Sequence, residues 1–292
     1  MAEEERIAIL VDSCSDVPRA IREQYNMYLA PQILIYPEGE YRDGIDLEPS
    51  QVYSRFPDEI PSTSLPDMAT VTDIVHQIKH DGYNRIAAFC ISSGLSGTAN
   101  LFRLVPPPEG MRIEVVDSLN IGIGSGFNAI LGAKLIEAGM KFDELIATCR
   151  EQVANSKLFI NFAMLDYLRK GGRIGRVAGL VGSLLDIKPI VSCDENGIYY
   201  PVAKAKGRKR QLRTALKEAV EFAKGWNRYN LTVMHADSPE EAAEVEAELK
   251  RLLPNYEMFI GGELTPALVV HTGPQLIGIG VQRLPDFAPS FA

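Results

Sequence analysis

The chain has 292 residues and a formal net charge of −8 at pH 7, and 46% of its residues are hydrophobic. This length fits two domains with sizeable cores, and the acidic balance argues against nucleic acid as the main partner. No apolar run approaches the roughly 18 residues of a membrane span, and the first ten residues do not resemble a signal peptide. We therefore expect a soluble, cytoplasmic protein without stable membrane insertion.

The first half of the chain alternates short apolar runs with helical patterns. Strands are predicted at residues 7–13, 29–36, 85–92 and 112–118, and helices at 68–83 and 125–139. Ser15 or Asp16 is expected to cap a further helix that has Pro18 in its first turn. Continuous apolar strands separated by helices indicate a parallel sheet that is covered on both faces. Residues 1–155 are therefore expected to form a Rossmann-like, three-layer α/β/α domain.

The pattern changes after about residue 155. Strands are predicted at 157–164, 231–236 and 267–274, a hairpin at 189–205, and helices at 211–224 and 238–253. This mixture indicates a second α/β domain, residues 156–292, in which helices cover one side of a two-layer mixed sheet. Because no proline- or serine-rich linker separates the halves, we expect the domains to abut, with the ligand site in the cleft between them.

One polar turn, ISSGLSGT at 91–98, joins a predicted strand to a predicted helix at the sheet edge where α/β proteins bind ligands. It lacks the lysine of a P-loop, and Thr98 stands where a nucleophile elbow needs glycine. Its hydroxyls and amides can still form a cup for an anion, or simply cap the helix. A serine hydrolase stays open, because His235 and His271 both end predicted strands.

Three other segments carry groups that suit an anion. Thr63 and Ser64 lie between two prolines, Arg173 follows a Gly-Gly turn, and His271 ends a predicted strand. Their structural alternatives are an exposed loop, a capped helix end and a buried structural histidine. A basic run at 204–213 is either a solvated face or a docking surface for an acidic partner. No His or Cys pair has the spacing of metal ligands, so no metal is expected.

Several short motifs occur in order along nearly the whole chain. They are VDSCSD at 11–16, YRDGID at 41–46, STSLP at 62–66, ISSGLSGT at 91–98, VVDS at 115–118, YLRKGGRIG at 167–175, LLDIKPI at 184–190, KGRKR at 206–210 and HTGP at 271–274. Each motif is weak alone, but the ordered set at these spacings resembles the DegV family of bacterial fatty-acid-binding proteins. The chain departs from the family pattern at 67–71, 119–126 and Gln275, so the resemblance does not define the preferred acyl chain.

The resemblance implies that one long-chain fatty acid is buried between the two domains, with no other cofactor. Members of the family are the lipid-carrying, non-catalytic subunit of a fatty acid kinase. A separate ATP-binding subunit, related to dihydroxyacetone kinases, phosphorylates the acyl carboxylate, and the acyl-phosphate feeds phospholipid synthesis. By similarity, the carboxylate site maps onto Thr63, Ser64, Ser93, Ser96, Arg173 and His271. The docking surface for the kinase maps onto Lys206, Arg208, Lys209 and Arg210.

Two other functional hypotheses remain beside the carrier of a fatty acid kinase. The chain could be a self-sufficient serine hydrolase or small-molecule kinase, or it could be a lipid sensor without a kinase partner. For the direct contact with the carboxylate we favour Ser96 over Ser93, because Ser96 lies nearer the amides of the predicted helix.

Overall fold

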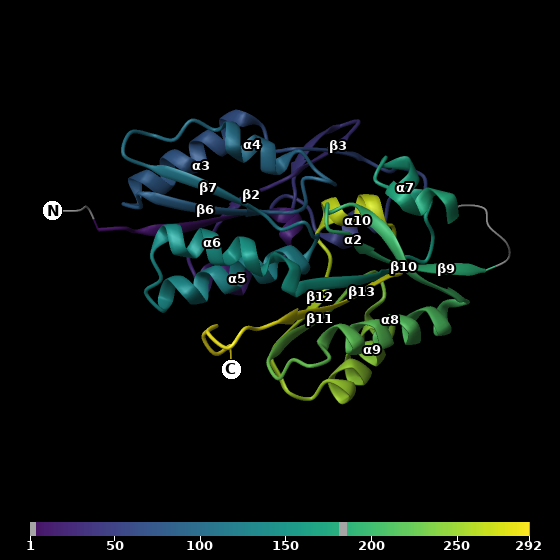
Figure 1. The fold of residues 1–292 in the computed structure, drawn as a ribbon. Coiled ribbons are helices and arrows are strands. Elements are labelled where there is room, and N and C mark those ends of the chain that lie inside the picture. The colour runs from purple at the N-terminus through teal and green to yellow at the C-terminus, as the bar shows by residue number, and fades with distance from the viewer. Residues whose placement is uncertain (1–3, 181–185, 292) are drawn as a thin grey trace.

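The structure is a computed structural model that describes residues 4–180 and 186–291 (Figure 1). The first three residues of the chain, and the first two of the 184–190 motif, lie outside this range. Within it the strands form a four-stranded, a six-stranded and a small three-stranded sheet. The predicted α/β fold class is confirmed, and the small sheet is an addition to it.

The four-stranded sheet is parallel, and its strands come from the first half of the chain. Its order is β2-β1-β6-β7, formed by Tyr28–Ala30, Ile7–Asp12, Arg85–Cys90 and Arg112–Asp117. Side chains alternate between its faces, so that Leu10 joins one core and Val11 the other. Helices α3 and α4 cover the first face and α5 and α6 the second (Figure 1), over Met68–His80, Thr98–Leu104, Ile123–Glu137 and Phe142–Gln152. This is the predicted three-layer arrangement.

The six-stranded sheet is mixed, and all its strands follow residue 155. Its order is β10-β9-β8-β13-β11-β12, and only β11 and β12 run parallel. The strands span Tyr199–Lys206, Ile187–Cys193, Ser156–Asn161, Leu276–Arg283, Tyr229–Ala236 and Tyr256–Glu263. Helices α8 (Arg208–Ala223) and α9 (Pro239–Leu252) cover one face, as expected.

Helix α5 joins the two halves, because it packs against both large sheets. It contacts β1 and β6 on one side and β8 and β13 on the other. Nearly all of its residues are buried, and apolar side chains therefore surround it instead of forming one stripe. The second face of the six-stranded sheet is thus not open to water but shares one core with the first half.

The prediction of a single strand at 29–36 was wrong. Pro31, which has no N–H to donate, interrupts it. The chain then leaves the parallel sheet, and β3 (Ile33–Tyr36) pairs with β4 (Gly39–Arg42) and β5 (Ser62–Ser64) in the small antiparallel sheet. The segment that holds Thr63 is therefore a strand and not the exposed loop considered above.

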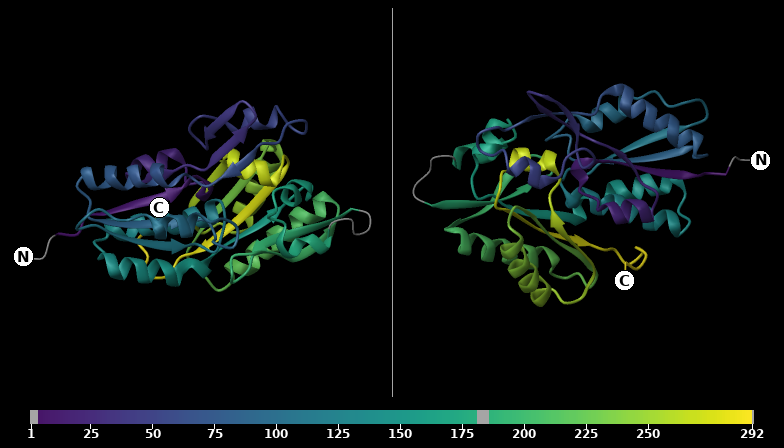
Figure 2. Two further views of the ribbon diagram at one scale, coloured as in Figure 1. Left: turned by 90° about the horizontal axis from the view of Figure 1, so that it is seen from above. Right: turned by 180° about the vertical axis from the view of Figure 1, so that it is seen from behind.

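The prediction of a final strand at 267–274 was also wrong. These residues form most of helix α10, Pro266–Thr272, and the final strand is β13. Valine and threonine favour a strand locally, but Pro266 at the first helical position favours a helix start. Helix α10 contacts the small sheet, α2 (Pro49–Tyr53) and α7 (Asp166–Lys170). In the right view of Figure 2 this yellow helix lies above the strands of the six-stranded sheet, near the middle of the molecule.

Shorter elements complete the described chain. They are η1 (Ser13–Ser15), α1 (Arg19–Gln24), η2 (Val153–Asn155) and η3 (Gly175–Leu180). The predicted cap of the first helix was wrong, because Pro18 occupies the N-cap position of α1 and no side chain caps it there. Ser15 instead donates to Asp12, and Asp16 caps a different helix, as described below.

Candidate functional site

A cavity of about 400 Å³ lies where the small sheet, the 91–98 turn and helix α10 meet. Its walls come from both halves of the chain. They include Cys14, Gln32, Thr63, Ser64, Leu65, Ile91, Leu95, Ser96, Ile121, Leu168, Arg173, Tyr199, Leu268, His271 and Thr272. Five of the six residues expected to bind a carboxylate are therefore brought to one cavity, although they lie up to 208 positions apart in the chain.

At the polar end of the cavity, Thr63 on β5 meets His271 in the last turn of α10. Thr63 Oγ1 and His271 Nε2 are 2.7 Å apart, which is a hydrogen bond. Burial, and then the nearby charge of Arg173, lowers the pKa of His271 to about 4. The imidazole is therefore neutral at pH 7, and its Nδ1 is buried without a hydrogen-bond partner among the described residues.

The Gly-Gly-Arg segment after α7 packs directly on this histidine. A Cβ atom added to Gly171 would lie 2.2 Å from His271 Nδ1, so only a residue without a side chain fits against the ring. Arg173 folds back and donates from Nη1 to the Gly171 carbonyl at 2.6 Å. The glycine therefore serves the contact with the imidazole, in addition to ending the helix.

Ser96 belongs to a second polar group on the cavity wall. Its Oγ is 2.8 Å from Thr98 Oγ1, which accepts a hydrogen bond from Gln32 Nε2 at 2.9 Å. Ser93, by contrast, is exposed and does not line the cavity, and its backbone N–H donates to Asp117. Gln32 escaped the sequence analysis because it follows Pro31 in what looked like a continuous strand.

No serine nucleophile is assembled here. Among the described residues, neither Ser93 nor Ser96 is hydrogen-bonded to a histidine. His235, on β11, accepts a hydrogen bond from the Ser238 N–H at 3.4 Å, and His271 contacts Thr63. These contacts therefore do not include the hydrogen bond between a serine nucleophile and a histidine base that the hydrolase hypothesis requires.

A smaller apolar space of about 30 Å³, which we call the apolar extension, adjoins the cavity. The two spaces share Ile121, Tyr199, Leu268 and Thr272 as walls. Beyond this junction the extension is lined by Gly122, Ile123, Leu158, Ile160, Met234, Leu264, Leu276 and Gly278. An apolar space that is closed at one end by hydroxyl, imidazole and guanidinium groups suits a long amphipathic molecule with an acidic head.

Two buried carboxylates hold helix α10 in place. Asp16 accepts the Thr265 N–H at 3.1 Å and Asp43 accepts the Ala267 N–H at 2.9 Å. Burial raises the pKa of Asp16 to about 8 and that of Asp43 to about 6. The acidic motifs near residues 16 and 43 thus cap a helix more than 200 residues away, and that helix carries His271.

Asp12 ends strand β1 beneath the 91–98 turn. Its carboxylate accepts the Ile91 N–H at 2.8 Å and the Ser15 hydroxyl at 3.2 Å. Burial raises its pKa to about 7. This strand-end acid therefore supports the start of the turn and does not line the cavity.

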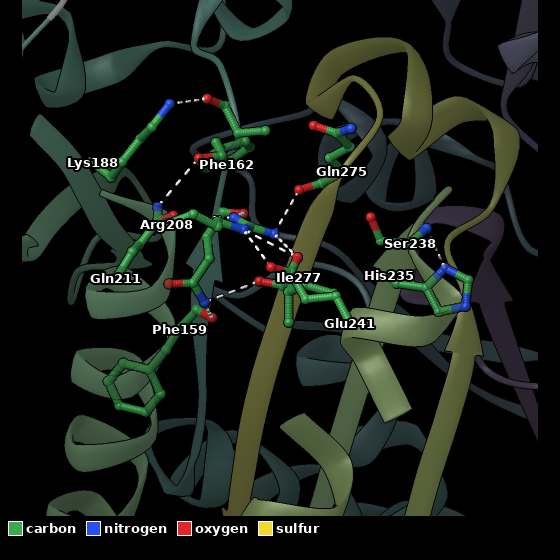
Figure 3. A network of polar contacts seen from close by, with 12 residues as sticks. Phe159, Phe162, Lys188, Arg208, Gln211, His235, Ser238, Glu241, Gln275 and Ile277 are labelled. Atoms are coloured by element: carbon green, nitrogen blue, oxygen red, sulfur yellow. Dashed lines mark hydrogen bonds and ion pairs between the residues drawn. The ribbon is translucent and has the colours of Figure 1, made fainter. Parts of the chain in front are cut away.

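The predicted docking surface divides into one partly buried arginine and three exposed side chains. Arg208 forms an ion pair with Glu241 at 2.6 Å and donates to the carbonyl oxygens of Asn161 and Gln275 (Figure 3). It therefore ties α8 to α9, β8 and the segment before β13. The exposed members of the predicted docking surface are Lys206, Lys209 and Arg210.

The described residues contain no group of three or more His, Cys, Asp or Glu side chains placed to hold a metal ion. None of the described helices is both long enough and apolar enough to cross a membrane.

The fold and the site define an α/β protein that has two large sheets, a small third sheet and a largely apolar cavity with polar groups at one end. The chain belongs to the DegV family, since the model of the family described as "Uncharacterised protein, DegV family" matches residues 6–284. Two DegV domain-containing proteins of Clostridium acetobutylicum are 36% and 33% identical to it. In each case the match covers 94% of this chain and 98% of the relative.

Solved structures of the family share the whole fold. A fatty-acid-binding DegV protein of Bacillus subtilis is 26% identical, with a TM-score of 0.86, over 96% of this chain and 100% of that one. A DegV lipid-binding protein of Thermotoga maritima is 26% identical, with a TM-score of 0.81, over 96% and 99%. A DegV protein of Thermus thermophilus, described by its fatty acid binding, superposes with a TM-score of 0.89 at 24% identity, over 96% and 100%.

Proposed function

We propose that this protein binds one long-chain fatty acid, with its carboxylate at the Thr63–His271 end and its tail along the apolar walls of the main cavity, toward the adjoining apolar extension. The observation that carries the proposal is a cavity of about 400 Å³ that has hydroxyl, imidazole and guanidinium groups in its lining and an almost wholly apolar space next to it. Burial of the tail would supply most of the affinity, at about 0.8 kcal/mol for each methylene. The relatives from Bacillus subtilis and Thermotoga maritima, described as fatty-acid-binding and lipid-binding proteins, support the same assignment.

The carboxylate would be held by hydroxyl groups and an arginine. Ser96 and Ser64 line the cavity with Thr63, and Arg173 adds the positive charge that balances the ligand. His271 is neutral, so its imidazole can donate one hydrogen bond to the ligand but does not balance the negative charge of the carboxylate. Ser93 is left out of this set, because it is exposed and outside the lining.

The bound acid would serve as the substrate of a separate ATP-binding kinase subunit. The chain itself would not be catalytic, and the kinase would transfer a phosphoryl group to the acyl carboxylate, giving an acyl-phosphate for phospholipid synthesis. Residues 91–98 lack the lysine of a P-loop, and among the described residues neither Ser93 nor Ser96 is hydrogen-bonded to a histidine; both observations support a carrier over a self-sufficient enzyme.

Extraction of the purified protein with organic solvent, followed by mass spectrometry, tests the binding proposal. We expect a fatty acid of long chain, and delipidated protein should take up palmitate. Ser96→Ala should weaken palmitate binding about tenfold, as expected for one lost hydrogen bond to a charged group, while Ser93→Ala serves as the matched control. Failure to retain or bind any fatty acid would contradict the proposal.

The kinase step needs its own measurement. Loaded protein would be mixed with ATP and a candidate kinase subunit from the same genome, and acyl-phosphate would be trapped with hydroxylamine. Product that requires both proteins supports the carrier role. Fatty acid binding without any product with such subunits would favour the lipid sensor instead.

A further inference from the structure

A second cavity, of about 370 Å³, lies on the face of the six-stranded sheet that α8 covers. It is formed by the ends of β7 and β9, the starts of β8 and β10, the segment around η2, and Phe222 on α8. None of the described residues lines both this space and the main cavity or the apolar extension. The second cavity is therefore separate from the site proposed to hold the lipid.

Strands β8 and β10 turn alternate side chains toward the two sites. On β8, Lys157 lines the second cavity and Leu158 lines the apolar extension. On β10, Tyr200 lines the second cavity and Tyr199 lines the main cavity. Since neighbouring side chains of a strand point to opposite faces, the two sites lie on opposite faces of one sheet.

Three hydrogen-bond donors line the second cavity where it meets the sheet. Lys157 Nζ donates to Tyr200 Oη at 3.0 Å, so the phenol proton stays free for another acceptor. Ser192 lies directly opposite Tyr200 in the antiparallel pair of β9 and β10, and both side chains therefore point to the same face. No hydrogen bond joins the Ser192 hydroxyl to another described residue. One ammonium and two hydroxyl groups can thus donate together to a single oxyanion.

The ammonium group of Lys157 lacks an acidic partner. Its side chain is half-buried, and no ion pair joins it to a described residue. A partly buried ammonium gains from a nearby negative charge, which a bound anion would supply. The other cation of this lining, Arg150, is already paired with Glu114 at 2.8 Å. Lys157 is therefore the cation that remains available to a ligand.

Acidic side chains limit the charge that the second cavity can accept. Glu151 and Glu195 are exposed members of its lining, and no ion pair joins either to a described residue. They would repel a polyanion such as a nucleoside triphosphate. Asp194, in the same lining, is offset by its ion pair with Arg176 at 3.0 Å. This balance suits a ligand with a single negative charge.

The apolar part of the wall suits a flat ring. The ring centroid of Phe222 lies 5.9 Å from Lys157 Nζ and 4.3 Å from the guanidinium carbon of Arg283, so cations hold this ring in place. Leu119 and Val153 add apolar side chains. A ring in a ligand can pack against Phe222 in the offset or edge-to-face arrangement that aromatic pairs prefer. The volume is also in the usual range for small-molecule sites.

We propose that the second cavity binds a small aromatic carboxylate. Its carboxylate would accept hydrogen bonds from Lys157, Tyr200 and Ser192, and its ring would lie against Phe222. The ligand is bound without a covalent step. This site goes beyond the proposed function, and it would stand if fatty acid binding failed.

The test uses protein loaded with palmitate, so that the main cavity is filled, or protein as purified if palmitate does not bind. Indole-3-propionate is the probe. Its amide, indole-3-propanamide, keeps the ring and removes the charge, whereas octanoate keeps the carboxylate and removes the ring. Dissociation constants would be measured by ligand-detected NMR titration for wild type, Lys157→Met, Lys157→Arg and Tyr200→Phe. Lys224→Met is the matched control, because Lys224 is exposed, is paired with Glu221 at 3.3 Å and lies outside the lining.

We expect indole-3-propionate to bind at one site, and both the amide and octanoate to bind at least about tenfold more weakly. Lys157→Met should weaken the probe about tenfold and Tyr200→Phe about fivefold, as for one charge-assisted and one neutral hydrogen bond. Lys157→Arg should retain most of the affinity, and Lys224→Met should retain all of it. If Lys157→Met does not fold, Tyr200→Phe, which keeps the ring, decides the question.

Three results would overturn the inference: no saturable binding of the probe, equal binding of its amide, or unchanged affinity in both Lys157→Met and Tyr200→Phe. Octanoate that binds as tightly as the probe would refute an aromatic ligand. Displacement of the probe by further palmitate would place it in the main cavity and would also refute the proposal. Palmitate uptake is measured separately, so failure of the proposed function is distinguished from failure of this inference.

Discussion

Gly171→Ala offers a direct way to disturb the Thr63–His271 pair at the polar end of the cavity. Gly171 has a φ of −76°, so alanine is allowed by the backbone, and any cost must come from its side chain. The added Cβ would lie 2.2 Å from His271 Nδ1 and 2.9 Å from its Cε1. Because contacts of this kind normally begin near about 3.4 Å, the ring must move by about 1 Å. The 2.7 Å hydrogen bond to Thr63 should break.

The expected cost combines two effects. A lost hydrogen bond between neutral groups costs about 1 kcal/mol, and overpacking costs about 1–3 kcal/mol. The free energy of unfolding should therefore fall by about 2–4 kcal/mol in urea denaturation. Gly39→Ala is the control, since nothing lies within 4 Å of its added Cβ and its φ is not positive. Palmitate binding should also weaken about tenfold, through the displaced histidine.

A double variant decides whether the clash is the cause. In a His271→Ala background the ring is absent, so adding Gly171→Ala should cost less than about 0.5 kcal/mol. The same loss of stability in both backgrounds would refute the reasoning, because it would mean that alanine at 171 disturbs the backbone and not the imidazole.

Three further results are expected. Burial raises the pKa of Asp16 and Asp43 above the unfolded value of about 3.9, so the stability they contribute is full below that pH and is lost as pH rises through about 6 to 8. Urea titrations should show this decline, and Asp43→Asn should flatten part of it; stability that rises over this range would contradict it. Arg208→Ala should cost about 2 kcal/mol in unfolding free energy, against less than about 0.5 for exposed Lys209→Ala, and equal losses would argue against the network in Figure 3. Met234→Ala should enlarge the apolar extension and shift competition between palmitate and stearate toward stearate, by about 1.6 kcal/mol at most for the two further methylenes, and an unchanged preference would place the tail elsewhere.

The elements that the sequence predicted well are those whose periodicity agrees with their packing. Strand β6 is apolar after Arg85 because both of its faces are covered, and α9 shows one apolar stripe because it lies on the surface of a sheet. Helix α10 was misread because its valines favour a strand locally. Its first amides are satisfied by Asp16 and Asp43, which are distant in the chain and leave no signal near residue 266.

For the site, the motifs identified residue types but not their partners. Both Ser93 and Ser96 of ISSGLSGT were expected at the carboxylate site, with Ser96 favoured for the direct contact, but the path of the turn exposes the first, and only the second lines the cavity. Likewise, Arg208 looks like any member of a basic run until α9 and β8 surround it. Side-chain direction depends on backbone geometry over a few residues, and burial depends on what packs above them.

By itself, the sequence determined the α/β class, the order of most strands and helices, and the hydroxyl-rich and Gly-Gly-Arg segments, because these depend on local periodicity and turn chemistry. Only the tertiary structure decided that β5 and α10 place Thr63 against His271, that Gly171 packs on the ring, and that residues from both halves of the chain line one cavity. The physical reason is that a cavity is formed by side chains from distant segments, and their mutual distances are set by the packing of the sheets and helices that carry them.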